Sequence, residues 1–201
     1  MTIKTCFFDM GNVLVYFSHQ KMCGNIAELS GLSEDQVRQF LMDEGRQWAL
    51  ERGELSEEQL LEELSRQSGR VLKLDDLRHA AANIFWLNES IVPVLQELKT
   101  AGIRLVLLSN TSVTHVRFIE QNFRVLDYMD DRVMSFEVGA MKPDPAIFHA
   151  ALAKAGCAPE ECFYTDDIQP YIDQAAALGI HSHPYTTTEL LRQALHEHGV
   201  L

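Results

Sequence analysis

The stretch FFDMGNVLVYF, residues 7–17, decides the fold, because a single acid follows an apolar run and a turn comes directly after it. Residues 3–8 are mostly apolar and predict a short buried strand that ends at Asp9. Gly11 and Asn12 favour a sharp turn, since both residue types tolerate backbone conformations that most others avoid. The sequence therefore predicts a lone carboxylate at the end of a strand.

Helix and strand patterns alternate after Asn88. The run IRLVLLS, residues 103–109, is almost continuously apolar, as in a strand that is buried on both faces of a parallel sheet. Similar patterns predict strands at 132–135, 161–165 and 180–183, and helices at 89–100, 112–122, 145–155, 171–178 and 187–197. Because this alternation is typical of βαβ units, we predict an α/β fold with a doubly wound parallel sheet.

Residues 18–87 have a helical pattern instead. Residues 33–36 and 56–59 each have the Ser-x-x-Gln spacing of a capping box, and apolar residues at helical intervals follow both. We predict four helices in this region. The chain then divides into an inserted helical cap domain, residues 18–87, and a Rossmann-like core domain formed by residues 1–17 and 88–201.

The composition of the 201-residue chain excludes several classes of partner. A formal net charge of −12 repels polyanions, so we expect no nucleic-acid partner. No window approaches the roughly 18 consecutive apolar residues of a membrane span, so we expect no membrane partner. The chain begins with a strand pattern and not with a signal peptide, which predicts a cytoplasmic protein, and we expect a monomer or weak dimer. The four cysteines lack a C-x-x-C pair and are expected to be reduced core thiols.

Polar residues follow four of the predicted strands or precede the next helix. They are Asp9, the run Ser109-Asn110-Thr111, Lys142, and the pair Asp166-Asp167. Each has an ordinary structural explanation, as a turn residue, a helix cap, a solvated lysine, or acids at a helix start. Ligands bind at the carboxyl ends of the strands in open parallel sheets, however, so all four together predict one catalytic site at that edge.

With these motifs the sequence resembles the haloacid dehalogenase superfamily, in the branch with a helical cap after the first strand. FFDMGNVL resembles its first motif, LVLLSNTS its second, EVGAMKPDPAIF its third and CFYTDDIQPYIDQAAALGI its fourth. ERGELSEEQL resembles a recurring segment of the cap. The combination of D-x-G-N-V-L in the first motif with S-N-T in the second is similar to that of small sugar-phosphate phosphatases of the glucose-1-phosphatase type.

The resemblance implies that Asp9 is the catalytic nucleophile and forms an aspartyl-phosphate that water hydrolyses. A carboxylate suits this role because it is already deprotonated at neutral pH. The resemblance also implies Mg²⁺ as cofactor, held by Asp9, Asp167 and the backbone carbonyl of Gly11. Magnesium prefers such oxygen ligands and offsets the repulsion between a carboxylate and a phosphate.

The same resemblance implies that Ser109, Asn110 and Lys142 bind the phosphoryl oxygens of a small phosphorylated metabolite. Fixed donors of this kind stabilise the charge that develops in a phosphoryl-transfer transition state. Asp166 stands where relatives often have glycine, and is a candidate support for the metal site.

Two positions depart from the commonest pattern. Gly11 stands where most of these phosphatases have an aspartate that serves as general acid and base, and Tyr171 stands where an Asp or Asn often supports the metal. Loss of general acid-base assistance costs about 10²- to 10⁴-fold, so it slows the chemistry without abolishing it. The glucose-1-phosphatase-like branch also carries glycine here, and a cap residue or a water could supply the proton.

The cap segment DEGRQWALERGE offers Arg46, Trp48, Glu51 and Arg52 as residues that could meet a substrate. Packing inside the cap and surface ion pairs are the alternative interpretations of these side chains.

Our leading hypothesis is a Mg²⁺-dependent phosphatase that hydrolyses a small phosphomonoester, such as a sugar phosphate. A haloacid dehalogenase would share Asp9 and Lys142 but needs no metal, and Asp167 argues against it. A phosphometabolite-binding or regulatory protein that has lost turnover is the alternative that Gly11 and Tyr171 favour. A mutase is less favoured, because it relies on the missing acid-base group.

Overall fold

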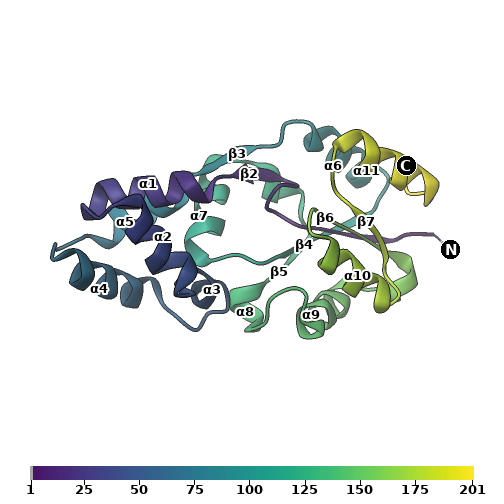
Figure 1. Ribbon diagram of the computed structural model, residues 1–201. Coiled ribbons are helices and arrows are strands. Elements are labelled where there is room, and N and C mark those ends of the chain that lie inside the picture. The colour runs from purple at the N-terminus through teal and green to yellow at the C-terminus, as the bar shows by residue number, and fades with distance from the viewer. Residues whose placement is uncertain (1) are drawn as a thin grey trace.

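A five-stranded parallel sheet forms the centre of the protein (Figure 1). The computed structural model describes residues 2–201. The strands follow the order β5-β4-β1-β6-β7, so β1 lies in the middle, and the chain adds strands first on one side of it and then on the other. Their bounds are β1 Thr5–Phe8, β4 Arg104–Ser109, β5 Asp131–Met134, β6 Cys162–Asp166 and β7 His181–Pro184. The predicted doubly wound α/β fold is confirmed.

Helices cover both faces of this sheet. They are α6 Ile91–Thr100, α7 Val113–Asn122, α9 Pro145–Ala155, α10 Gln169–Ala177 and α11 Thr188–Glu197. Phe8 and Leu107 pack in one core with α6 and α11, while Phe7, Val106 and Leu108 pack in a second core with α9 and α10. Alternate residues of a strand point to opposite faces, which is why residues 6–8 of β1 and 105–108 of β4 are apolar at every position. Full burial of each such side chain stabilises the fold by about 1.5–3 kcal/mol.

A helical insertion, residues 18–84, lies between the two strands of a ribbon that joins it to the sheet domain (Figure 1). The ribbon consists of β2 Val15–Phe17 and β3 Phe85–Leu87, which pair antiparallel with Phe17 opposite Phe85. Both predicted capping boxes form, at Ser33 and at Ser56. The helices are α1 His19–Ser30, α2 Glu34–Arg38, α3 Arg46–Glu51, α4 Glu57–Ser68 and α5 Leu74–Ala82, with a π-helical turn at Gln39–Asp43.

The prediction of four helices over residues 18–87 is wrong in two respects. The described chain has five α-helices there, because a turn at Glu44 and Gly45 separates α3 from α2 and the π-helical turn. Residues 85–87 form a strand, since they pair with a segment some 70 residues earlier. No local pattern signals such a distant partner.

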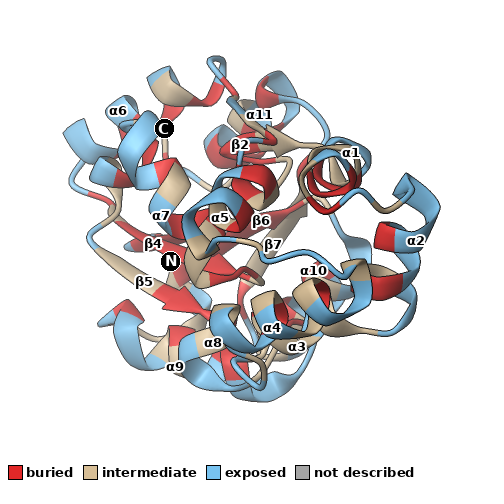
Figure 2. Cartoon of the chain, turned by 90° about the vertical axis from the view of Figure 1, so that its left-hand side faces the viewer, coloured by how far each residue is buried: buried red, intermediate tan, exposed pale blue. Residues whose placement is uncertain are grey.

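Other predicted elements lie within two residues of the observed ones. The structure adds a short helix, α8 Ser135–Val138, and 3-10 turns at Val125–Tyr128 and Pro159–Glu161. Buried residues concentrate in the strands and on the inner sides of the helices (Figure 2). Within residues 2–201, every helix is too short or too polar to cross a bilayer.

Candidate active site

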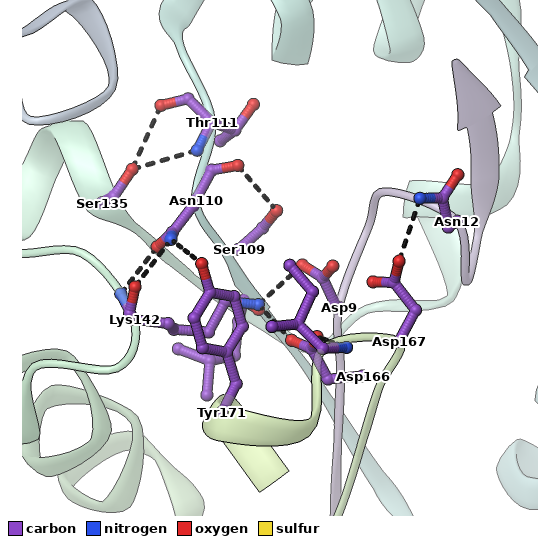
Figure 3. Close-up of polar contacts among 12 residues, drawn as sticks. Asp9, Asn12, Ser109, Asn110, Thr111, Ser135, Lys142, Asp166, Asp167 and Tyr171 are labelled. Atoms are coloured by element: carbon purple, nitrogen blue, oxygen red, sulfur yellow. Dashed lines mark hydrogen bonds and ion pairs between the residues drawn. The ribbon is translucent and has the colours of Figure 1, made fainter. Parts of the chain in front are cut away.

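Four polar side chains from distant parts of the sequence meet at the carboxyl end of the sheet (Figure 3). Asp9 follows β1, Ser109 ends β4, Asp166 ends β6, and Lys142 comes from the loop before α9. All four side chains are buried, Lys142 with 3% of its surface exposed and Asp166 with none. The structure therefore brings together the residues that the sequence predicts at this edge.

Lys142 lies at the centre of the site. Its Nζ donates to Asp9 Oδ1 at 2.8 Å, to Asp166 Oδ2 at 2.5 Å and to the Leu108 carbonyl at 2.9 Å. These three bonds use all the donors of an ammonium group. Burial lowers the pKa of Lys142, but the attraction of Asp9 and Asp166 outweighs burial and raises it overall. Lys142 is therefore a fixed positive charge beside Asp9.

The Asp9 carboxyl shares this one ammonium with a second acid. Burial raises the pKa of Asp9 to about 7, Lys142 opposes the rise, and the charge of Asp166 adds to it. Tyr164 also donates a hydrogen bond to Asp166. The site thus holds more negative than positive charge, and a further cation would favour the ionised form of Asp9.

The donor set fits a divalent cation. One carboxylate oxygen from each of Asp9, Asp166 and Asp167 lies within 4.8 Å of the others. Asp167 is the exposed member, and Asn12 Nδ2 donates to its Oδ2 at 2.9 Å. Asn12 has a φ of 55°, in the left-handed region that asparagine tolerates better than most residues. An all-carboxylate cluster suits Mg²⁺.

Asn110 holds the Lys142 loop and does not present a free amide. Its Oδ1 accepts from the Lys142 N–H at 2.8 Å, and its Nδ2 donates to the Lys142 carbonyl at 3.0 Å and to the Tyr171 hydroxyl at 3.3 Å. Ser109 Oγ has only a long contact of 3.4 Å with the Asn110 carbonyl. The Ser109 hydroxyl is therefore the freer of the two groups to meet a ligand.

Sequence reasoning missed several supporting residues. Ser135 Oγ accepts from the Thr111 N–H at 3.0 Å and donates to the Thr111 carbonyl at 3.2 Å. Tyr164 and Asn12 each orient one of the acids, as described above. The glycine-asparagine turn was a usable signal for Asn12, whereas Ser135 and Tyr164 stand in runs without a distinctive pattern.

The position of Gly11 is covered by an aromatic ring. A Cβ added to Gly11 would lie 2.9 Å from Cε1 of Phe17, closer than such atoms normally approach. Phe17 ends strand β2, and its ring centroid is 4.9 Å from that of His19. The space beside Gly11 is therefore occupied by the end of β2, the strand that leads into the helical insertion.

The helical insertion packs against the loops of the site. A Cβ on Gly53 would lie 2.6 Å from the Phe136 carbonyl oxygen, and Arg52 Nη1 is 4.0 Å from Met141 Sδ. Glu57 accepts a hydrogen bond from Thr114 of α7. A cavity of about 330 Å³ lies between the insertion and the sheet domain, and its lining includes Gln47, Ser112, His115 and Phe136.

The four cap residues singled out from the sequence have different surroundings. Arg46 pairs with Glu63 at 2.6 Å and lies over the Phe40 ring, so it holds the insertion together. Trp48 is exposed and Arg52 pairs with neighbouring Glu54. Glu51 is buried.

Known proteins resemble this chain over most of its length. A D-ribitol-5-phosphate phosphatase of Bacteroides thetaiotaomicron is 28% identical over 191 residues, covering 88% of this chain and 89% of that protein. A phosphatase of Mycobacterium tuberculosis is 23% identical, covering 91% and 87%. A haloacid dehalogenase family enzyme from B. thetaiotaomicron, solved with magnesium and inorganic phosphate, has a TM-score of 0.83 at 23% identity, covering 94% and 100%.

The sequence family of haloacid dehalogenase-like hydrolases matches residues 3–179, which contain all the strands of the sheet except β7 and all the polar residues of the site. This chain belongs to the haloacid dehalogenase-like hydrolases.

Proposed function

We propose that this protein is a Mg²⁺-dependent phosphatase that hydrolyses a small phosphomonoester through an aspartyl-phosphate on Asp9. The observation that carries the proposal is the position of Asp9, which is held at 2.8 Å by the buried ammonium of Lys142 beside two further acids. The phosphatase relatives and the related structure with magnesium and phosphate support it.

The proposed reaction assigns each residue a role that its surroundings allow. The Asp9 carboxylate attacks phosphorus, the bond from phosphorus to the leaving oxygen breaks, and water later releases phosphate from Asp9. Ser109 offers a donor to the phosphoryl oxygens, and Asn110 keeps the Lys142 loop in place. The Lys142 ammonium, whose three donors go to Asp9, Asp166 and the Leu108 carbonyl, would attract the phosphoryl group through its charge. Mg²⁺ would be held by the carboxylates of Asp9 and Asp167 and by the carbonyl of Gly11, in the turn after Asp9. Asp166 lies nearby. The ion would neutralise charge on the phosphoryl group.

The substrate class that we propose is a sugar or polyol phosphate. The relative that is 28% identical is named for D-ribitol 5-phosphate. The cavity of about 330 Å³ between the insertion and the sheet domain is large enough for a leaving group of that size, and it offers polar side chains such as Gln47 and Ser112 among apolar ones.

A panel of phosphate esters, assayed with Mg²⁺ and with EDTA, tests the proposal. Turnover should require Mg²⁺ and should fall by about 10⁴-fold in Asp9→Asn, as expected for loss of a nucleophile. Asp76→Asn, which removes an exposed carboxylate from the insertion, is the matched control and should retain full activity. Equal rates in both buffers, or no turnover of any ester, would refute the proposal.

The covered position of Gly11 favours a second candidate, a phosphometabolite-binding protein without turnover. Calorimetry would then detect binding of a sugar phosphate with no release of phosphate. Release of chloride from a haloacid without Mg²⁺ would point instead to a dehalogenase.

A further inference from the structure

One buried acid lies outside the cluster at the sheet edge. Among residues 2–201, three carboxyl groups are buried, those of Asp9, Asp166 and Glu51. The first two share Lys142, whereas Glu51 belongs to α3 of the helical insertion. Its only described side-chain partner is neutral, because Gln47 Nε2 donates to Glu51 Oε1 at 2.8 Å. A buried carboxyl group without a paired cation favours its protonated form.

The end of α3 brings Glu51 to the loop that carries Lys142. Arg52, the next residue, contacts Met141 of that loop, and Gly53 lies against Phe136 of the preceding helix α8, as described above. Burial raises the pKa of Glu51, and the hydrogen bond from Gln47 and the charges of Lys142 and Arg52 only partly oppose the rise. Glu51 is thus the buried acid of a helix that ends against the loop of Lys142.

The partner of Glu51 also faces the cavity. Gln47 lines the cavity of about 330 Å³ together with Ser112 and Phe136. Ser112 caps α7 two residues after Asn110, so the cavity reaches α3 at Gln47 and the start of α7 at Ser112.

Cleavage of an alkyl phosphate needs a proton donor near the leaving oxygen. An alkoxide leaving group is strongly basic, and a general acid lowers the barrier to its departure. Gly11 has no side chain to serve, and the Phe17 ring occupies the space next to it. We propose that Glu51 is the general acid of the reaction and then its general base, an inference that rests on the proposed phosphatase function.

The proton transfers balance over one turnover. As Asp9 bonds to phosphorus, the electron pair of the breaking bond stays on the leaving oxygen, which takes the proton of the Glu51 carboxyl group. The alcohol leaves, and Glu51 remains as a carboxylate. Water then attacks the aspartyl-phosphate, Glu51 takes a proton from that water, and Asp9 is released as a carboxylate with phosphate as product.

Glu51→Gln tests the proposal, because it keeps an oxygen acceptor for Gln47 and removes the transferable proton. For an alkyl phosphate, kcat/KM should fall by about 10²- to 10⁴-fold. For p-nitrophenyl phosphate, whose leaving group needs no proton, kcat/KM should change by less than about threefold, since kcat/KM reports the steps up to loss of the leaving group. Glu62→Gln, at an exposed position of α4, is the control and should leave both values unchanged.

The outcomes separate this inference from the function on which it rests. If Asp9→Asn loses activity on both esters and Glu51→Gln loses activity on the alkyl phosphate alone, the phosphatase function and the role of Glu51 are both supported. An equal loss of both esters in Glu51→Gln, or no loss of either, overturns the role of Glu51 while Asp9→Asn still reports on the function. If Glu51→Gln does not fold, Glu51→Asp keeps the acid, and its ratio of alkyl to aryl activity must remain above that of Glu51→Ala.

Discussion

Replacement of Lys142 by methionine should destabilise the protein as well as inactivate it. The Lys142 ammonium is 2.8 Å from Asp9 and 2.5 Å from Asp166, and only 3% of the residue is exposed. Lys142→Met keeps most of the side-chain volume and removes the charge. Two carboxyl groups then remain buried without a cation, and the Leu108 carbonyl loses a donor.

Removal of one partner from a buried ion pair costs about 3–5 kcal/mol. For a chain of this length, that loss lowers the melting temperature by roughly 6–20 °C. The loss should depend on pH, because burial raises the pKa of Asp9 to about 7 and Lys142→Met removes the charge that opposes this rise. An acid whose folded-state pKa lies above its unfolded value destabilises the fold when ionised, so the deficit should grow as the pH rises from 5 to 8 and shrink as the pH falls.

Urea unfolding of the metal-free protein at pH 5 and pH 8 measures this effect, with Asp166→Asn and the double variant completing a mutant cycle. The double variant should be more stable than the sum of the two single losses by about 0.5–3 kcal/mol, because Asp166→Asn removes one of the orphaned charges. A deficit below about 1 kcal/mol at pH 8, or strict additivity in the cycle, would refute this account of the site.

Two further predictions concern the metal and the turn. Mg²⁺ at ten times its dissociation constant should stabilise the protein by about 1.4 kcal/mol, which calorimetry would detect as a rise in melting temperature of roughly 3–6 °C. At a fixed Mg²⁺ concentration, the rise in melting temperature should be smaller at pH 5.5 than at pH 8, since the pKa of Asp9 is raised to about 7 and protons compete with the ion. The rise should be absent in Asp167→Asn. Gly11→Ala should lower the free energy of unfolding by about 1–3 kcal/mol, because its Cβ would meet the Phe17 ring at 2.9 Å. Phe17→Leu should relieve most of that loss, and full stability of Gly11→Ala alone would contradict the contact.

The sheet was predictable because its signals are local. A strand buried on both faces needs successive apolar residues, and residues 105–108 within the run at 103–109 meet that requirement. The β2–β3 ribbon was not predictable in this way. Each of its strands has only three residues, and Phe85 finds its partner Phe17 across the whole insertion.

The candidate site was predictable to the level of its charged residues and no further. Asp9, Lys142 and Asp167 stand in short motifs next to strand ends, where the sheet topology dictates convergence. The role of Asn110 in binding phosphate stays a prediction, and the structure adds that its amide is hydrogen-bonded to the Lys142 backbone. These bonds depend on where two loops meet in space, which motif spacing does not encode.

The β2–β3 ribbon makes the helical insertion an exchangeable module. Phe17 and Phe85 are cross-strand partners, so the two points where the chain leaves and re-enters the sheet domain are only about 5 Å apart. A two-residue Asn-Gly turn has the geometry to close that gap and convert the ribbon into an ordinary hairpin. The sheet domain could therefore exchange one lid for another, or carry none, without any change in the path of its own strands.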